Sequence, residues 1–327
     1  MKRVETTNLD SIANYRMVEE ADPVAGQGEV LIRVAACGVG YVDALEALGR
    51  YQVKPPLPHV PGQEISGSIV ALGQGVSGLR VGDRVMTQIH GGFAELAVAA
   101  ADAVVIIPDN MAFAQAAGFK INYLTVLHAL RDRGQLQPGE TMLVIGAAGG
   151  VGSAAVQVGK CLGAKVIAVA SSAQKRDFAR QVGADQVIDP ASGDFRAQVK
   201  ELCGQKGPDV VFDPVCGPLF EPAFRSLTWG GRHLVVGFAG GEIPALRANL
   251  PLLKGASLVG VDVRQFQLYE ARKGARHLQE LLQWVAAGDL APPIGKRFGF
   301  DEFIPALEYA LSGTGLGKTV FEVIKAS

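Results

Sequence analysis

A cluster of glycines at residues 147–152, Ala-Ala-Gly-Gly-Val-Gly, carries the clearest chemical signal in the sequence. It follows an apolar strand at 142–145, leads into a helix, and has GxGxxG spacing with Ala147 in the first glycine position. Gly149 would let the backbone approach a pyrophosphate, and Gly152 would let the helix pack closely on the strand. The helix N-terminus adds amide donors for phosphate. The pattern predicts a dinucleotide site, and the alternative is a glycine-rich turn without a ligand.

The end of the next strand bears on which dinucleotide is bound. An Asp or Glu at this place would hold the ribose 2′-hydroxyl of NAD. The chain instead reads Ala170-Ser171-Ser172, followed by Lys175 and Arg176. Hydroxyls and cations suit a 2′-phosphate, which a carboxylate would repel. The sequence therefore favours NADPH over NADH, unless the two cations only form the solvated face of the following helix.

These residues need a parallel sheet to position them. From Thr141 onward, apolar strands and helices alternate with short connections, which predicts a doubly wound α/β sheet of six strands. The first 120 residues read as short β-segments broken by Gly and Pro, which indicates a mostly antiparallel β-domain. A helix is expected over 116–134, ending at Gly134. The strand at 319–327 is expected to return to the first domain.

Composition excludes several classes of protein. The 31 basic and 32 acidic residues nearly cancel and form no long run, so no nucleic-acid partner is indicated. No apolar run is long enough to cross a membrane, and the polar N-terminal stretch favours a cytoplasmic location. The four cysteines have no CxxC pair and read as reduced thiols, and the five histidines have no metal spacing.

The sequence resembles the medium-chain dehydrogenase/reductase superfamily. The stretches that carry the resemblance are residues 26–67, "NYLTVLHAL", "LQPGETMLVIGAAGGVGSAAVQVGK" and "GRHLVVGFAGGEIP". The resemblance implies a Rossmann domain at 123–265. It also implies a GroES-like catalytic β-domain formed by residues 1–122 together with 266–327.

The catalytic zinc ligands of many superfamily members are missing. The first ligand cysteine would align with Gly40, the histidine with Gln63, and the third ligand with residues 119–122, which contain no cysteine. Zinc needs several N, S or O ligands that converge on one point. The chain therefore resembles the zinc-free branch, the NADPH:quinone reductases and related enone and enoyl-thioester reductases, and we expect no metal. A zinc alcohol dehydrogenase is the disfavoured alternative.

The loss of zinc limits the chemistry. Zinc polarises an alcohol so that hydride can leave its carbon. Without it, hydride delivery to an electron-poor acceptor, a quinone or an α,β-unsaturated carbonyl compound, is the easier reaction. Negative charge then develops on the carbonyl oxygen, where a few donors can stabilise it.

The resemblance also assigns residues to the cofactor. Thr125 lies near the nicotinamide or its ribose, and three residues after the fifth strand line the nicotinamide. Pro190 departs from the family pattern, in which a Tyr follows the third strand, so the phosphate contact is looser or is completed by Arg176. The full set of expected cofactor-binding residues is Thr125, Gly149, Gly150, Val151, Gly152, Ser171, Ser172, Lys175, Val236, Gly237 and Phe238.

Three residues are candidates for catalysis. Tyr41 and Tyr51 match family positions, and the Tyr51 phenol can donate to a developing oxyanion, although an ordinary half-buried loop tyrosine fits equally well. Lys120 lies in an apolar stretch and could supply a proton if desolvated; the alternative is a packed stem with an ammonium in water.

Two acidic residues near these candidates are expected to serve the backbone. Asp43 is expected to order its loop, and Asp213 to make a turn or cap contact before Pro214.

We therefore expect a zinc-independent NADPH-dependent oxidoreductase that acts on a small electrophilic molecule. Gly40 and Leu45 replace family side chains, Asn and Tyr, which suggests a roomier pocket and keeps an enoyl-thioester reductase open. The same losses keep open a non-catalytic NADPH-binding redox sensor or partner protein. The apolar sixth strand at 256–263 would form a sheet edge, which suggests a homodimer.

Overall fold

The computed structural model describes residues 1–323, and the chain divides into two compact units. Unit 1 contains Met1–Lys120 and the chain from Pro292 onward, and unit 2 contains Ile121–Ala291. We had expected the returning segment to start at residue 266. Residues 266–291 instead pack within unit 2, because Lys273, His277 and Glu280 bind side chains of that unit.

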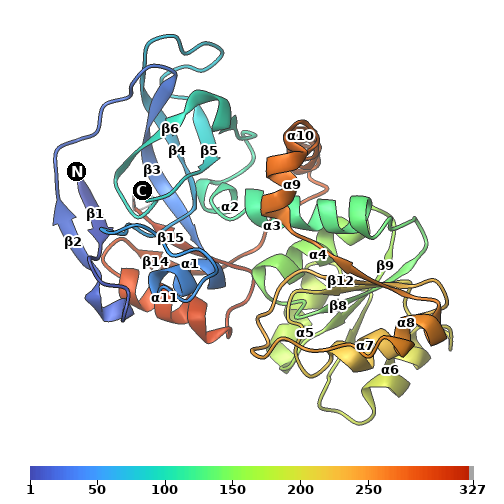
Figure 1. The fold of residues 1–327 in the computed structure, drawn as a ribbon. Coiled ribbons are helices and arrows are strands. Elements are labelled where there is room, and N and C mark those ends of the chain that lie inside the picture. Colours follow the sequence, from blue (N-terminus) through green and yellow to red (C-terminus); the bar gives the residue numbers. More distant parts are fainter. Residues whose placement is uncertain (324–327) are drawn as a thin grey trace. The chain divides into compact units, whose positions relative to one another are not determined.

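Unit 1 is a mostly antiparallel β-structure, as its short apolar segments predicted (Figure 1). Its large sheet has the strand order β14-β15-β3-β4-β5-β7, and β6 also pairs with β3. Its elements are β1 (Lys2–Glu5), η1 (Ile12–Asn14), β2 (Arg16–Glu19), β3 (Glu29–Val39), α1 (Tyr41–Ala47), β4 (Glu64–Leu72), β5 (Arg84–Gln88), β6 (Leu96–Ala100), η2 (Ala101–Ala103), β7 (Val105–Ile106), α2 (Phe113–Ala116), β14 (Ile294–Gly299), α11 (Phe303–Ser312) and β15 (Lys318–Glu322).

The last strand does return to the first sheet. β15 pairs antiparallel with β3, with Phe321 opposite Cys37. Phe321 is fully buried and stacks on Phe93 at a centroid distance of 4.2 Å. This packing anchors the strand in the core of unit 1. The end of the predicted strand, residues 324–327, lies outside the described residues.

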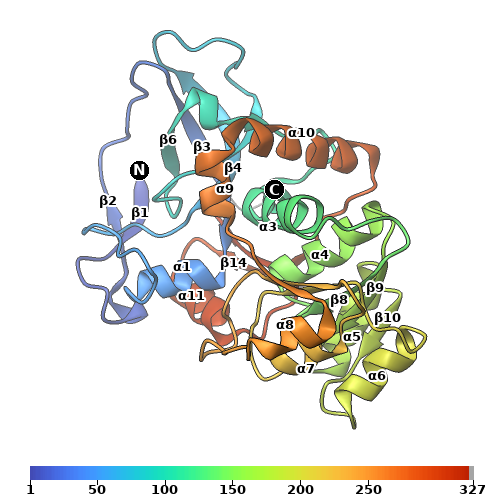
Figure 2. The same ribbon diagram turned by 45° about the vertical axis from the view of Figure 1, so that its right-hand side comes forward.

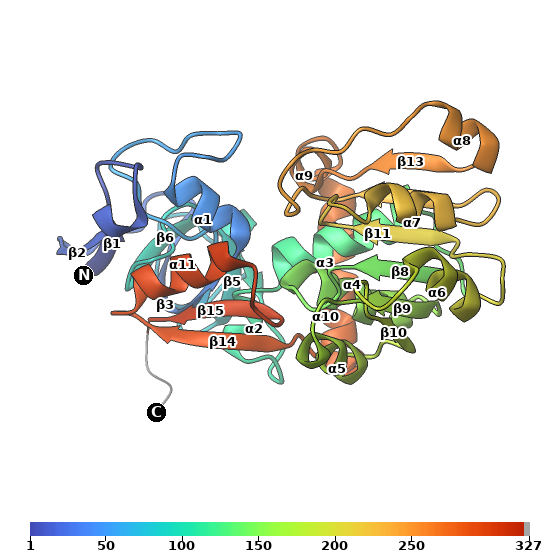
Figure 3. The same ribbon diagram turned by 90° about the horizontal axis from the view of Figure 1, so that it is seen from below.

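Unit 2 contains the predicted six-stranded parallel sheet, in the order β10-β9-β8-β11-β12-β13 (Figure 3). Figure 1 shows α4 on one face of this sheet and α6 and α7 on the other. Its elements are α3 (Lys120–Leu127, whose first residue belongs to unit 1), η3 (His128–Arg133), β8 (Thr141–Ile145), α4 (Gly150–Cys161), β9 (Lys165–Val169), α5 (Ala173–Gln181), β10 (Gln186–Ile188), α6 (Phe195–Leu202), β11 (Val210–Asp213), α7 (Phe220–Ser226), β12 (Arg232–Val235), α8 (Asn249–Lys254), β13 (Ser257–Gly260), α9 (Val263–Tyr269) and α10 (Ala271–Ala287).

The strand sequences explain why this sheet forms. Apart from one polar end residue each, the central strands β8, β9 and β11 are continuous apolar runs. A parallel sheet is covered on both faces, so its strands need no alternation of apolar and polar residues. Side-chain oxygens then start the helices: Ser172 caps α5, Asp194 caps α6 and Asp262 caps α9. Local signals thus fix where strands end and helices begin.

The expected helix over 116–134 is divided. A short α2 ends at Ala116, α3 begins at Lys120, and the last turns, η3, are a π-helix that ends at Gly134. The Gly134 amide donates to the Ala129 carbonyl over 2.7 Å, a bond spanning five residues. Figure 2 shows α10 running beside this helix. Among residues 1–323, no helix is both long and apolar enough to cross a membrane.

Candidate functional site

The glycine turn joins β8 to α4 in unit 2. Gly146 has φ of +64°, so the left-handed residue of the turn precedes Ala147, the position to which we had assigned the first glycine. Ala147 is fully buried, and its amide donates to the Val169 carbonyl over 3.2 Å. The motif therefore tolerates alanine at 147, because Gly146 makes the turn.

The two later glycines of the motif have different environments. A Cβ atom at Gly152 would lie 2.2 Å from the Gly146 carbonyl oxygen, so close helix–strand packing requires glycine there. A Cβ at Gly149 would meet only that oxygen, at 3.7 Å, which is ordinary contact. Protein packing therefore does not demand glycine at 149. Gly149 and Gly150 are only half-buried, so a phosphate can reach the backbone at the start of α4.

The strand β9 ends in two exposed serines. Ser171 and Ser172 are exposed, and the Ser172 hydroxyl accepts a hydrogen bond from the Lys175 amide over 3.2 Å, which caps α5. Lys175 is half-buried in the first turn of that helix. Hydroxyl groups, an amide-rich helix start and a lysine are suitable partners for a phosphate monoester.

Arg176 has an internal role. Its Nη1 donates to the Ala170 carbonyl over 3.1 Å and pairs with Asp189 Oδ2 at 3.0 Å. Its side chain is only 18% exposed, so it is not merely a solvated helix face. Because Asp189 compensates its charge, Arg176 contributes less to binding an anion than a lone cation would.

The carboxyl ends of β11 and β12 bring two loops together. The Val236 amide donates to the Asp213 carbonyl over 3.0 Å, and the Gly240 amide donates to the Val215 carbonyl over 2.7 Å. Val236 and Gly237 are half-buried and Phe238 is 42% exposed. These three predicted residues therefore lie at the sheet edge where doubly wound folds bind ligands.

Asp213 does make the predicted turn contact. Its Oδ1 accepts hydrogen bonds from the amides of Val215 and Cys216, over 2.9 and 2.8 Å. Sequence reasoning missed its other partner, His233, whose Nε2 lies 3.2 Å from Asp213 Oδ2. The only signal was a histidine inside an apolar strand, and 20 residues separate the two.

Thr125 lies in α3 and is buried. Its hydroxyl donates to the Ile121 carbonyl over 2.6 Å, one helical turn earlier. This bond fixes the rotamer and leaves the oxygen lone pairs available to accept.

The three catalytic candidates come from separate segments of unit 1. Tyr41 begins α1 and is 38% exposed, Tyr51 lies half-buried in the following loop, and Lys120 begins α3. Burial lowers the pKa of the Lys120 ammonium, against the raising effect of the Glu64 carboxylate. A lysine with a lowered pKa gives up its proton more readily, which is one of the two possibilities that the sequence left open for Lys120.

A buried charge cluster near Gly40 was only partly foreseen. Asp43 orders its loop as predicted, since its Oδ2 accepts from the Gly40 amide over 2.7 Å, while its buried Oδ1 has no partner. The Lys318 ammonium lies 3.1 Å from Glu64 Oε2. Burial raises the pKa of Asp43 from 3.8 to about 6, and the charge of Lys318 opposes this. Lys318 was missed because 254 residues separate it from Glu64.

Two of the positions at which zinc-dependent superfamily members carry their ligands, Gly40 and Gln63, lie in unit 1. Gly40 caps α1 with its backbone, and a Cβ there would lie 3.6 Å from Lys318 Nζ. Within residues 1–323, no group of three or more His, Cys, Asp or Glu side chains is arranged to hold a metal ion.

Comparison with known proteins places the chain in a family. Residues 26–109 match the alcohol dehydrogenase GroES-like domain, and residues 150–285 match the zinc-binding dehydrogenase family. Quinone oxidoreductase-like protein 2 of Mus musculus is 35% identical over 308 residues, which cover 93% of this chain and 88% of the mouse protein.

Two solved structures are similar over nearly their whole length. Escherichia coli quinone oxidoreductase complexed with NADPH is 26% identical with a TM-score of 0.89, covering 99% of this chain and 100% of that one. The CurK enoyl reductase is 27% identical with a TM-score of 0.88, covering 98% of both chains.

The chain belongs to the medium-chain dehydrogenase/reductase superfamily of oxidoreductases. Within that superfamily it is a quinone oxidoreductase-like protein.

Proposed function

We propose that this protein is a zinc-independent oxidoreductase that uses NADPH to reduce a quinone or an α,β-unsaturated carbonyl compound. The main support is the sheet edge of unit 2. There a half-buried glycine turn follows β8, and the neighbouring strand β9 ends in two exposed serines and no carboxylate. The similarity to a quinone oxidoreductase complexed with NADPH supports the same cofactor here.

The residues fit this cofactor. Gly149, Gly150, Val151 and Gly152 would hold the pyrophosphate, since the open backbone at 149 adjoins the start of α4. Ser171, Ser172 and Lys175 would hold the 2′-phosphate. Thr125, Val236, Gly237 and Phe238 would border the nicotinamide, which when bound supplies the hydride.

On the acceptor side, residues of unit 1 would stabilise charge and move a proton. The Tyr51 hydroxyl, with Tyr41 as the second candidate, would donate to the oxygen that becomes negative as hydride adds. Lys120 would deliver a proton from its ammonium. Because Gly40 and Gln63 replace two ligands that zinc would need, we assign the polarising role to these donors rather than to a metal.

Steady-state kinetics test the proposal. We expect turnover of NADPH with at least one of a panel of quinones, enones and enoyl-CoA esters, and a higher kcat/KM with NADPH than with NADH. Ser171→Asp should reverse much of that preference, because its carboxylate would repel a 2′-phosphate and suits a free 2′-hydroxyl. A preference of the wild-type enzyme for NADH would overturn the cofactor assignment.

Variants in unit 1 test the catalytic assignments. Tyr51→Phe and Lys120→Met should each lower kcat by tenfold or more, within the range of a lost donor or proton source, with little change in the Kd of NADPH. Tyr41→Phe tests the second candidate, and a loss of kcat confined to that variant would move the oxyanion role to Tyr41. If Tyr51→Phe retains full kcat, the oxyanion assignment is wrong.

An enoyl-thioester reductase is the second candidate, supported by the similarity to the CurK enoyl reductase. It predicts a kcat/KM for enoyl-CoA esters above that for quinones in the same panel. A non-catalytic NADPH-binding sensor is the third. It predicts measurable NADPH affinity with no turnover of any acceptor.

We also propose a homodimer formed through β13. This strand closes one edge of the unit 2 sheet, and Leu258 on it is 43% exposed (Figure 3). An open edge favours pairing with a second copy. Light scattering should give the mass of a dimer, and Leu258→Lys should shift it toward the monomer; a wild-type monomer at micromolar concentration would refute the assignment.

A cytoplasmic location is proposed on the basis of the four free cysteines, which suit a reducing compartment. Cell fractionation tests it, and recovery of the protein outside the cytoplasmic fraction would contradict it.

A further inference from the structure

The pair of Asp213 and His233 is the most enclosed histidine–carboxylate contact in the described part of the chain. Both side chains have zero exposure, and Asp213 Oδ2 lies 3.2 Å from His233 Nε2. The imidazole packs against two rings of α7, Phe220 at a centroid distance of 4.8 Å and Phe224 at 6.1 Å. A buried carboxylate needs such a partner, because water cannot reach it.

Asp213 holds the first of two loops at the sheet edge. Its Oδ1 accepts from the amides of Val215 and Cys216, and Cys216 has φ of +47°, which few residues other than glycine adopt. The carboxylate therefore holds residues 214–217 in a turn that the backbone alone would not favour.

The second loop, residues 236–240, depends on the first. Beyond the bonds from Val236 and Gly240 already described, the Ala239 amide donates to the Pro214 carbonyl over 3.4 Å. The loops also touch closely, since a Cβ at Gly240 would lie 2.7 Å from the Gly217 Cα. A shift of Asp213 would therefore move Gly237 and Phe238 with it.

The histidine fixes the orientation of this carboxylate. Its Nε2–H donates to Oδ2, while its Nδ1 is buried without a partner, so the ring has no competing hydrogen bond to turn it elsewhere. With the histidine removed, Oδ2 would be buried and unpaired, and the carboxylate would rotate or draw in water.

We propose that His233 is a positioning residue for the nicotinamide half of the cofactor, acting through Asp213 on the loops at 214–217 and 236–240. This inference rests on the proposed function, since it takes the sheet edge of unit 2 to be the NADPH site. It adds a residue that does not itself touch the cofactor.

The affinities of two ligands report separately on the two ends of the proposed cofactor site. NADPH occupies both ends, whereas adenosine 2′,5′-bisphosphate carries the phosphate end without the nicotinamide. We expect His233→Phe, which fills the space but removes the donor, to raise the Kd of NADPH at least fivefold in a fluorescence titration. The Kd of adenosine 2′,5′-bisphosphate should stay within twofold, because its contacts lie near Ser171 and Lys175.

Conservative and control variants complete the design. His233→Gln places an amide donor at a similar reach and should recover most of the NADPH affinity. His277→Phe removes another histidine–carboxylate bond of unit 2 and should lower thermal stability without changing either Kd. If His233→Phe does not fold, His233→Asn, whose shorter amide does not reach Oδ2, serves for the same measurements.

The outcomes are distinct. Equal loss of both affinities in the His233 variants, or no loss, overturns the positioning role but not the proposal that the wild-type protein binds NADPH. Failure of the wild-type protein to bind NADPH overturns the proposed function and the inference together. A selective loss of NADPH affinity that glutamine reverses supports the inference, since a purely structural role would not separate the two ligands.

Discussion

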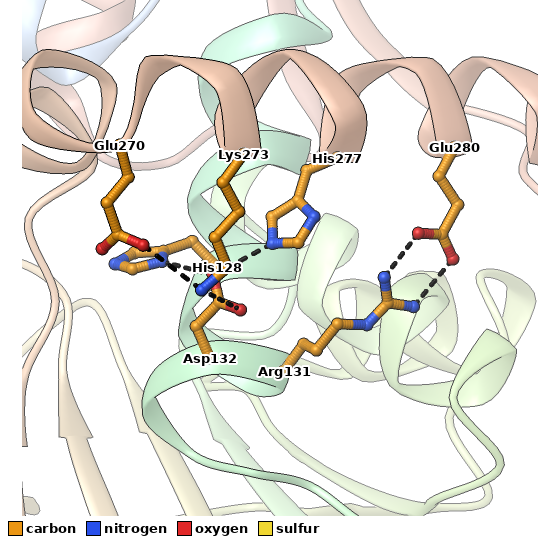
Figure 4. Close-up of polar contacts among 7 residues, drawn as sticks. All are labelled: His128, Arg131, Asp132, Glu270, Lys273, His277 and Glu280. Carbon is orange, nitrogen blue, oxygen red and sulfur yellow. Dashed lines mark hydrogen bonds and ion pairs between the residues drawn. The ribbon is translucent and has the colours of Figure 1, made fainter.

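Unit 2 contains two sites at which histidine meets aspartate, and they differ in almost every other respect. At the sheet edge, Asp213 and His233 are both fully enclosed. Between the helices, Asp132 is 10% exposed and accepts from His128 Nδ1 over 2.8 Å and from His277 Nε2 over 2.9 Å, while Lys273 pairs with its other oxygen at 2.9 Å (Figure 4).

The partners explain what each site does. Asp213 binds two backbone amides and so governs loop shape, whereas Asp132 binds three side chains and joins η3 to α10. Burial raises the pKa of Asp132, but the hydrogen bonds from His128, Lys273 and His277 outweigh it and lower the pKa below its ordinary value. The same residue pair thus serves a candidate binding site in one place and helix packing in the other.

The largest difference between the two sites should be in the free energy of unfolding that is lost when each aspartate is replaced by alanine. Asp213→Ala leaves His233 and two amides buried without their acceptor and should reduce the free energy of unfolding by about 3–5 kcal/mol. Urea denaturation at pH 7 measures this. A loss no greater than that of Asp132→Ala would break the comparison.

Unit 1 contains a buried histidine that is not paired with an aspartate and a buried aspartate that is not paired with a histidine. His59 is buried against the Tyr15 hydroxyl, 2.6 Å from its Nδ1, rather than against a carboxylate. Burial lowers the pKa of His59 from 6.5 to about 4. As the pH falls from 6.5 toward 4, the unfolded chain takes up a proton first, so His59 should reduce stability by about 3 kcal/mol over that range.

Urea denaturation of the wild type and of His59→Phe between pH 4.5 and 7.5 checks this. The difference between the two should change with pH in the stated direction. A difference that does not vary with pH would contradict the burial of a neutral imidazole.

Asp43 is the converse case, a buried carboxylate without a histidine. Because its pKa is raised from 3.8 to about 6, the unfolded chain loses its proton first as the pH rises between these values. Asp43 should therefore reduce stability by about 3 kcal/mol between pH 3.8 and 6. Relative to the wild type, Asp43→Asn should gain stability over this interval, measured by thermal denaturation, whereas a constant offset would argue against the raised pKa.

Asp132→Ala should have a smaller effect than Asp213→Ala. One of its three partners, Lys273, is 34% exposed, so water can replace the carboxylate there, while His128 and His277 are buried at 7% and 8% exposure. We expect a loss of about 2 kcal/mol in the free energy of unfolding, with NADPH affinity unchanged. A changed NADPH affinity would mean that the helix contact also governs the candidate cofactor site.

The smallest effect belongs to the neighbouring ion pair. Arg131 donates to both oxygens of Glu280 over 2.5 and 2.7 Å, and both side chains are 34% exposed. Glu280→Gln should cost about 0.5 kcal/mol, and the loss should shrink in 1 M salt. A salt-independent loss above 2 kcal/mol would show that the pair is effectively buried.

Sequence patterns predicted the local features of this chain well. The parallel strands and the glycine turn depend on residues a few positions apart, so apolar runs and glycine spacing reveal them. The Asp43 loop contact and the Asp213 turn were likewise foreseen, since each spans two or three residues.

What was missed depends on contacts between distant residues. The pairing of Lys318 with Glu64, of Arg176 with Asp189 and of His233 with Asp213 requires the strand order to be known first. The start of the returning segment was misplaced for the same reason. The roles of His277 and Glu280 on α10 could not be predicted either, because their partners lie on η3, far away in the sequence.

The position of β15 has a consequence for synthesis on the ribosome. This strand lies between β14 and β3, yet it is translated after the whole of unit 2. Unit 2 can therefore mature while the chain is still growing. The first half of β3 is already paired with β6, but its residues 36–39 wait unpaired until β15 emerges. During that interval the edge is open to wrong partners, so a nascent chain stalled before Lys318 should bind chaperones through unit 1.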